Sequence, residues 1–241
     1  MIKVHFIGIG GTGLSAIARV LVERGYTVSG SDRTLSSLAR ELAELGATVY
    51  EGHAAHHIAD ANIVIRSSAI PDDNPEVQAA LAAGIPVLKR ADFLGQLMAG
   101  YDCIAIAGTH GKTTTTSMTA WVLTRLGQDP SYIIGGVSKN LGNNAHAGQG
   151  KYFVIEADEY DHMFLGLDPL WAIVTIVEHD HPDCFPTPTD YRAAFVSFVN
   201  KIKPGGSLLA CQDDPGSASL AEGTVPPGCH TATYGISPSA E

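Results

Sequence analysis

The amino-acid sequence predicts an α/β protein in which a Rossmann-like parallel-sheet domain is followed by an incomplete P-loop ATPase domain. Short β-rich runs alternate with helical patterns, a glycine-rich turn follows the first run at residues 8–13, and a second alternating series with its own glycine loop begins at Tyr101. Because the alternation restarts there, we expect domains at 1–99 and 100–241, joined by a linker at 93–102.

The first domain is expected to hold a parallel sheet with helices on both faces. Its strand-like runs are rich in β-branched and apolar residues and lie at 3–8, 27–32, 48–52, 62–70 and 86–90. Its helical patterns lie at 13–25, 35–46 and 76–83. The alternation makes each connection between strands a crossover, which favours parallel pairing.

The second domain repeats this order around another sheet. Its strand-like runs lie at 102–108, 131–136, 151–158, 170–177, 207–212 and 231–235, and its helical patterns at 109–127 and 191–202. The tail from Asp213 to Glu241 is rich in Gly, Pro, Ser and Ala and offers too few elements to close a sheet. We therefore expect this domain to be incomplete.

Charge and composition exclude several classes of partner. With 15 basic and 25 acidic residues, the net charge of -10 argues against a nucleic-acid surface or an anionic membrane. Phosphates remain accessible ligands, since backbone N–H groups and a few placed cations are enough to bind them. The start of the chain lacks a signal-peptide pattern, and no apolar run reaches about 18 residues, so a cytoplasmic protein is expected. The four cysteines form no CxxC pair and are expected to be ordinary reduced thiols.

The first glycine turn has the pattern Gly8-x-Gly10-x-x-Gly13 between a strand and a helix. In that setting glycines permit a tight turn and let a pyrophosphate approach the positive end of the helix. Asp32 ends the second strand, where a carboxylate can accept hydrogen bonds from a ribose or a base. From these residues alone NAD is the default ligand, and a turn without a ligand is the alternative.

Other polar residues lie near the same edge of the first sheet. Ser67 and Ser68 follow the fourth strand, at the carboxyl edge where ligands bind in open α/β folds. A hydroxyl-rich turn without a ligand explains them equally well. His53, His56 and His57 are expected to be solvated loop histidines, because no carboxylate or cysteine is spaced to complete a metal site.

The second glycine loop, Gly108–Thr113, contains Gly-Lys-Thr between an apolar strand and a helix. In a P-loop the backbone N–H groups cradle phosphate oxygens, Lys112 neutralises β- and γ-phosphate charge, and the Thr113 hydroxyl can coordinate Mg²⁺. The loop departs from the general pattern at Ile106, where a glycine is usual. This loop is the strongest functional signal in the sequence.

Carboxylates and histidines follow the next two strands, again at their carboxyl ends. They are Glu156, Asp158, Glu159 and Asp161 after one strand, and His179, Asp180, His181 and Asp183 after the other. Glu156 is a natural ligand for the magnesium of a bound triphosphate, and His181 a less usual one. A solvated acidic loop and a zinc hydrolase site are the alternatives.

Seven short motifs together resemble the Mur ligases of peptidoglycan synthesis. They are GIGGTGLS at 8–15, SGSD at 29–32, SSAI at 67–70, AGTHGKTTTT at 107–116, EADEYD at 156–161, EHDHPD at 178–183 and DDP at 213–215. GIGG and SSAI look like the alanine-adding member of the family. EADEYD followed by DHPD is also similar to the member that adds a recycled murein tripeptide.

The resemblance implies an ATP-dependent carboxylate–amine ligase that binds UDP-N-acetylmuramate in place of NAD. The residues it assigns to the UDP-sugar are Gly10, Gly11, Thr12, Gly13, Asp32, Ser67, Ser68 and Asn144. Those it assigns to ATP are Gly108, Thr109, His110, Gly111, Lys112, Thr113 and Thr114. It further implies Mg²⁺ on Thr113, Glu156 and His181, with Lys112, Glu156 and His181 catalytic. ATP would phosphorylate the muramoyl carboxylate, and L-alanine would displace the phosphate.

Two departures from the family accompany this resemblance. Several Mur ligases carry a carbamylated lysine after the metal-binding histidine, whereas residues 190–194 read DYRAA. The third, C-terminal domain of the family is missing, so we expect a fragment that binds UDP-N-acetylmuramate but ligates poorly alone. A non-catalytic nucleotide-binding module is the competing hypothesis, and the oligomeric state is open.

Overall fold

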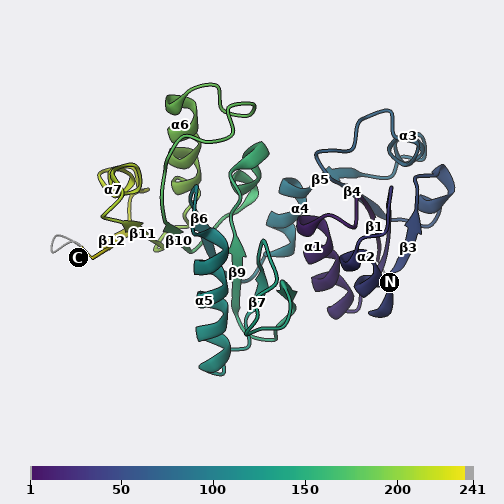
Figure 1. Cartoon of the computed structure of the whole chain (residues 1–241), viewed down its shortest axis with the longest axis horizontal. Helices are drawn as coiled ribbons and strands as arrows, with labels where there is room; N and C mark the ends of the chain where they lie inside the picture. Colours follow the sequence, from purple (N-terminus) through teal and green to yellow (C-terminus); the bar gives the residue numbers. More distant parts are fainter. Residues whose placement is uncertain (1, 237–241) are drawn as a thin grey trace.

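A computed structural model describes residues 2–236 and contains two sheets joined through helix α4 (Figure 1). The five-stranded first sheet has the order β3-β2-β1-β4-β5, and every pairing in it is parallel. Its strands are β1 (Lys3–Ile7), β2 (Thr27–Asp32), β3 (Thr48–Glu51), β4 (Ile63–Arg66) and β5 (Val87–Lys89). Its helices are α1 (Thr12–Glu23), α2 (Ser37–Glu44), η1 (Ala55–Ile58), α3 (Pro75–Ala82) and α4 (Arg90–Leu97).

Helices cover both faces of this sheet because successive residues of a buried strand point to opposite sides. Phe6 of β1 belongs to the apolar cluster that holds Ile17 of α1. Its neighbour Ile7 packs with Val77 and Ala80 of α3 in a separate cluster. The continuous apolar run of β1 therefore supports a layer on each side.

The second sheet has the order β12-β11-β10-β6-β9-β7-β8, and within residues 2–236 only the β7–β8 pair is antiparallel. Its strands are β6 (Asp102–Ala107), β7 (Ser131–Ile133), β8 (Ala145–His146), β9 (Tyr152–Glu156), β10 (Trp171–Val174), β11 (Ser207–Cys211) and β12 (His230–Tyr234). The helical segments are α5 (Lys112–Arg125), η2 (Tyr160–Gly166), α6 (Pro188–Val199) and α7 (Pro215–Ala221). The predicted α/β class and the two predominantly parallel sheets are confirmed.

The expected linker at 93–102 is wrong over its first half, because those residues continue α4. Phe93, Leu94 and Leu97 are buried in the main apolar cluster, which contains residues of both sheets. Figure 1 shows α4 between the two sheets. The segment joins the two halves by packing as a helix, and the boundary near residue 100 stays a prediction.

Further contacts fix the two halves against each other. A Cβ atom on Gly166 of η2 would lie 2.2 Å from the Ala91 carbonyl oxygen of α4, so the two backbones pack directly. At the far end of α1, Glu23 accepts a hydrogen bond from the Ala147 N–H at 2.7 Å and lies 2.9 Å from His146 Nδ1. The geometry of a site between the halves is therefore set by packing as well as by the chain connection.

The tail contains a helix that the sequence reading did not predict. Asp214 is the N-cap of α7, where its side chain accepts from the Ser217 N–H at 2.6 Å, and Pro215 is the first helical residue. Asp214 also accepts from the Val177 N–H at 2.9 Å, which ties α7 to the segment after β10. Across residues 2–236, no helix combines the length and the apolar character that a membrane span requires.

Candidate active site

The first glycine turn leaves β1, crosses the end of β2 and begins α1. Gly8 has a φ of +90°, and its N–H donates to the Ser31 carbonyl oxygen at 2.8 Å. The Gly10 N–H donates to Asp32 Oδ2 at 2.8 Å, and a Cβ on Gly10 would lie 2.9 Å from that oxygen. Gly11 is the N-cap of α1 and provides no side-chain cap. No N-cap side chain therefore satisfies the first N–H groups of α1, and this positive end of the helix attracts anions.

A cavity of about 490 Å³ lies beside this turn. Its lining includes Gly11, Asp32 and Ser67, which the sequence reading assigned to one ligand. It also includes His53, which that reading placed in solvent. Ser68 makes a different contact, donating to Asp161 Oδ2 at 2.5 Å and so bridging the two halves of the molecule.

The wall of this cavity is backed by a buried carboxylate network that corrects the expectation of solvated histidines. Glu76, at the start of α3, has a side chain that is 0% exposed. Its carboxylate accepts from the Ala54 N–H at 3.1 Å and lies 2.6 Å from His57 Nδ1. Ser31 also donates to Glu76, and His53 Nδ1 lies 2.9 Å from the Ser31 hydroxyl. Two of the three histidines thus belong to a packed polar network.

The second glycine loop is fastened to the end of β10. Gly108 has a φ of +137°, and its missing Cβ would lie 2.0 Å from Thr175 Oγ1. Thr109 is 9% exposed, and its hydroxyl donates to the Glu178 carbonyl oxygen at 2.8 Å. The Thr109 side chain therefore holds the loop in place, whereas His110 and Thr114 are exposed beside it.

Lys112 lies at the start of α5 and meets a carboxylate that the sequence reading did not select. Its Nζ lies 2.8 Å and 3.1 Å from the two carboxylate oxygens of Glu159, whose side chain is 0% exposed. The hydroxyl of Tyr191 donates to the same carboxylate at 3.1 Å and lies 2.9 Å from Thr109 Oγ1. Burial raises the pKa of Tyr191, so this phenol keeps its proton. Tyr191 lies in the DYRAA segment that lacks the family's lysine.

The oxygen donors expected to hold magnesium are partly assembled. Thr113 Oγ1 lies 3.0 Å from Glu156 Oε1, and Glu156 Oε2 accepts from the Gly135 N–H at 2.7 Å. His181 Nε2 lies 3.6 Å from Oε1 of Glu159, the carboxylate that binds Lys112. Within residues 2–236 no group of three His, Cys, Asp or Glu side chains is arranged to hold a metal. A hydroxyl and a carboxylate together still fit Mg²⁺, which retains several waters.

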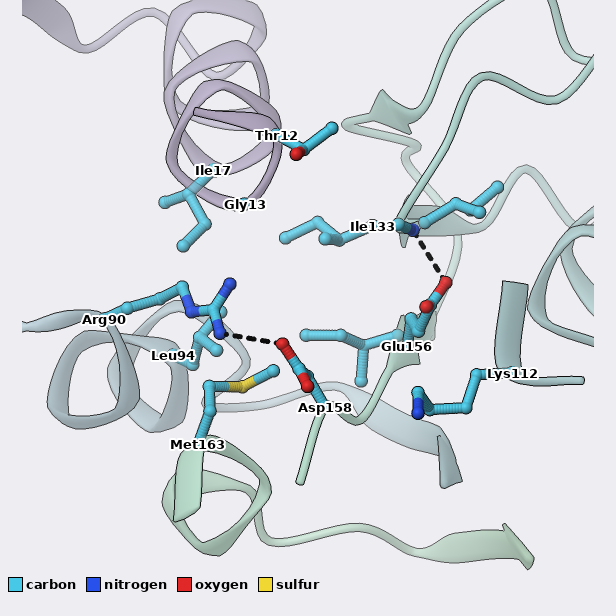
Figure 2. Close-up of a pocket in the computed structure, with 13 residues that line it drawn as sticks. Thr12, Gly13, Ile17, Arg90, Leu94, Lys112, Ile133, Glu156, Asp158 and Met163 are labelled. Atoms are coloured by element: carbon cyan, nitrogen blue, oxygen red, sulfur yellow. Dashed lines mark hydrogen bonds and ion pairs between the residues drawn. The ribbon is translucent and has the colours of Figure 1, made fainter. Parts of the chain in front are cut away.

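A second cavity, of about 230 Å³, opens between the two halves (Figure 2). Thr12, Gly13 and Arg90 line it from the first half, and Lys112, Glu156 and Asp158 from the second. Neighbouring residues at the start of α1 line the two cavities, Gly11 the first and Thr12 the second. A molecule bound along both would extend from Asp32 to Lys112.

Asn144 lines neither cavity, although it contacts Ile134, which lines the second. It is buried before β8, and its carbonyl oxygen accepts from the Ile134 N–H at 2.8 Å. Its side-chain Nδ2 is buried without a hydrogen-bond partner within the described chain. The structure therefore does not bring Asn144 together with the other residues expected to bind the sugar nucleotide.

The sequence reading missed Arg90, Tyr191 and Glu76 as site residues. Arg90 reaches across to Asp158, with Nη2 and Oδ2 3.1 Å apart. It follows a short strand at the carboxyl edge of the first sheet, and that position was a usable signal. Tyr191 and Glu76 carry no such signal, since each acts through contacts with residues distant in the sequence.

These features define an α/β protein with two mainly parallel sheets and a P-loop-like glycine turn at the start of α5. The chain belongs to the Mur ligase family. Residues 3–102 match the family description "Mur ligase family, catalytic domain", and residues 106–241 match "Mur ligase middle domain".

Similar proteins agree with this membership. A UDP-N-acetylmuramate–L-alanine ligase from Syntrophotalea carbinolica is 46% identical over 99% of this chain and 51% of its own length. The ligase of the same name from a Nocardioides species is 50% identical over 91% of this chain and 49% of its own length. The chain thus spans about half the length of the curated relatives it matches.

Solved structures support the same fold. A UDP-N-acetylmuramate:L-alanyl-gamma-D-glutamyl-meso-diaminopimelate ligase from Neisseria meningitides superposes with a TM-score of 0.87 at 29% identity, over 97% of this chain and 78% of that one. UDP-N-acetylmuramate-alanine ligase from Thermotoga maritima gives a TM-score of 0.84 at 29% identity, over 98% of this chain and 53% of that one.

Proposed function

We propose that this chain is the nucleotide-binding part of an ATP-dependent ligase that joins L-alanine to the carboxylate of UDP-N-acetylmuramate. The observation that carries the proposal is the cleft between the two halves. On one side is the uncapped start of α1, and on the other are Lys112 and the Thr113–Glu156 pair. Relatives 46% and 50% identical to this chain, named for that reaction, favour L-alanine as the amine.

Residues 1–99 bind the UDP-sugar in this proposal. Anionic oxygens of the pyrophosphate meet the N–H groups at the start of α1, in the turn from Gly10 to Gly13. Asp32 and Ser67 line the cavity beside this turn, and we assign the uridine to it. Ser68 bridges to Asp161, and it contributes by holding the two halves together.

Residues 100–241 bind ATP. The N–H groups of the loop from Gly108 to Thr114 cradle its phosphates, and Lys112 exchanges Glu159 for the γ-phosphate. Thr113 and Glu156 would hold magnesium, with His181 as a further ligand once its ring turns from Glu159. Magnesium in that position supplies Lewis-acid neutralisation of phosphate charge.

The proposed chemistry begins with a carboxylate, which is a poor electrophile. Its oxygen attacks the γ-phosphorus of ATP, the bond to ADP breaks, and an acyl phosphate forms. The amino group of L-alanine then attacks the acyl carbon, and inorganic phosphate leaves with its bonding electron pair. Lys112 stabilises the negative charge that develops in both steps, and the cleft holds the reactants in line.

Two other functions are compatible with the same cleft: ligation of a tripeptide, and nucleotide binding without catalysis. The Neisseria structure, with its TM-score of 0.87, favours a tripeptide as the attacking amine. A non-catalytic nucleotide-binding role also requires both cavities. A ligation assay that compares L-alanine with a tripeptide as the attacking amine separates the two ligases. Absence of ATP-dependent ligation with either amine identifies the binding role.

Calorimetric titration of this chain tests the proposal. We expect UDP-N-acetylmuramate and magnesium ATP to bind, and NAD to give no heat. Lys112→Ala should weaken ATP binding by roughly tenfold or more, because a charge-assisted contact is lost. Binding of NAD, or failure of wild-type chain to bind either proposed ligand, contradicts the proposed function.

A further inference from the structure

Arg90 is a cation in the cleft to which the proposed function assigns no role. Four charged side chains line this cleft: Arg90, Lys112, Glu156 and Asp158. Figure 2 shows Arg90 and Lys112 on opposite sides, with Asp158 between them and Glu156 on the side of Lys112. Lys112 serves the triphosphate and Glu156 pairs with Thr113. Arg90 and Asp158 therefore remain to be explained.

The guanidinium of Arg90 lies directly against the first turn of α1. A Cβ atom on Gly13 would be 2.2 Å from Arg90 Nη1, so only a glycine lets the two groups approach this closely without displacing the side chain. Arg90 also begins α4, where a positive charge faces the positive end of its own helix. Two helix N-termini and a guanidinium thus converge on one wall of the cleft, and together they favour an anion there.

Asp158 is the anion that meets Arg90 in this structure. The two side chains are 25% and 36% exposed, and one contact of 3.1 Å joins them. A guanidinium offers five N–H donors, and a single contact to Asp158 leaves donors for a second acidic group. Partial exposure also keeps the pair weak enough to be exchanged. Asp158 therefore holds Arg90 in the cleft and leaves some of its N–H donors available for a ligand.

The position of Arg90 lies on the route that the substrate must take. A sugar nucleotide with its uridine in the cavity beside Asp32 passes the start of α1 at Gly11 and Thr12 before it enters the cleft. Its pyrophosphate and its carboxylate are both acidic, and the carboxylate must end near Lys112 to be phosphorylated. Between those points Arg90 is the other cation that lines the cleft.

We propose that Arg90 binds an acidic group of the sugar nucleotide, so that the guanidinium exchanges part of its contact with Asp158 for the substrate. This inference rests on the proposed function, because it takes the cleft as the site of a UDP-sugar. It assigns to Arg90 the alignment of the substrate between the two halves. The acidic group is either the pyrophosphate or the carboxylate, and the ligands of the test separate these two.

Titration of this chain with UDP, UDP-N-acetylglucosamine and UDP-N-acetylmuramate tests the inference. Only the third ligand carries the carboxylate. We expect Arg90→Gln to bind UDP-N-acetylmuramate about 10-fold to 100-fold more weakly, the range for a lost hydrogen bond to a charged group. Arg90→Lys should recover part of the loss, since it keeps the charge without the fork of donors. Arg40→Gln, an exposed arginine on α2, is the matched control and should bind as wild type.

The outcomes discriminate as follows. A loss confined to UDP-N-acetylmuramate supports contact with the carboxylate, and an equal loss for all three ligands supports contact with the pyrophosphate. Unchanged binding of all three by Arg90→Gln overturns the inference while leaving the proposed function intact. Wild-type chain that binds none of the three overturns both. Asp158→Asn should bind at least as tightly as wild type, because a competing anion is removed, and its melting temperature reports whether the interface has been disturbed.

Discussion

Acid should weaken this fold through Glu76, whose carboxylate is buried and fully hydrogen-bonded. Burial alone would raise the pKa of Glu76, but hydrogen bonds from His5, Ser31, His57 and the Ala54 N–H outweigh it and lower the pKa to about 2. The ionised form is thus the one that the folded protein stabilises.

The sign and size of the effect follow from linkage between protonation and folding. An ordinary glutamate has a pKa of 4.5, above the value of about 2 in the fold. The contribution of ionised Glu76 is therefore fully present above about pH 4.5 and is lost as the pH falls toward 2. At 1.36 kcal/mol per pH unit, the whole difference is about 3 kcal/mol, of which about 2 kcal/mol is lost by pH 3.

Urea unfolding of wild-type chain and Glu76→Gln at several values between pH 7 and pH 3 measures this contribution. The free energy of unfolding of the wild type should fall by about 2 kcal/mol more than that of the variant over this range. Comparing the two cancels the titration of groups that they share. Glu44→Gln, on the exposed side of α2, should track the wild type. A gap between wild type and Glu76→Gln that stays constant from pH 7 to pH 3 would refute the reasoning.

Two substitutions test how the P-loop is held. Gly108→Ala should destabilise the fold by about 2–4 kcal/mol, because φ is +137° and the new Cβ would lie 2.0 Å from Thr175 Oγ1; a urea midpoint equal to that of the wild type would contradict this. Tyr191→Phe should lower the free energy of unfolding by about 1–3 kcal/mol, since the Glu159 carboxylate loses a buried donor at 3.1 Å. The same variant should also weaken ATP binding measured by calorimetry, because Glu159 orients Lys112, and an unchanged affinity would show that the phenol serves stability alone.

The parts of this structure that the sequence predicted are those fixed by local chain chemistry. The turns at Gly8 and Gly108 each have a positive φ and each connects a strand to a helix. Glycine spacing between an apolar run and a helical pattern signals that geometry within about ten residues. The nearness of Thr113 to Glu156 also followed, because Glu156 ends β9, β9 lies beside β6, and the loop after β6 leads to Thr113 at the start of α5.

Helix α4 contains the first half of the segment that was expected to be a linker. Phe93, Leu94 and Leu97 have the spacing of one helical face, and all three are buried. A linker was expected here because the alternation of strands and helices restarts at Tyr101. Gly95 would also weaken an isolated helix. Its absence of a side chain matters instead for packing, because a Cβ there would lie 2.9 Å from the Gly166 carbonyl oxygen. Packing between the two halves of the molecule stabilises this helix, and local sequence propensity carries no information about such packing.

The acidic run after β9 shows that a sequence motif does not predict which contact each of its side chains makes. Glu156 turns to Thr113 and the Gly135 N–H, Asp158 reaches Arg90, and Glu159 is buried against Lys112. Three carboxylates within four positions thus separate into a partner for Thr113, a bridge between the halves and a partner for Lys112. A run of acids predicts negative charge near phosphate, but the direction of each side chain depends on what the other half of the molecule presents. Arg90 lies on the first sheet's side of the cleft, so the role of Asp158 exists only once α4 has packed. Exchanging Asp158 and Glu159 should therefore disrupt both contacts while preserving the composition of the motif.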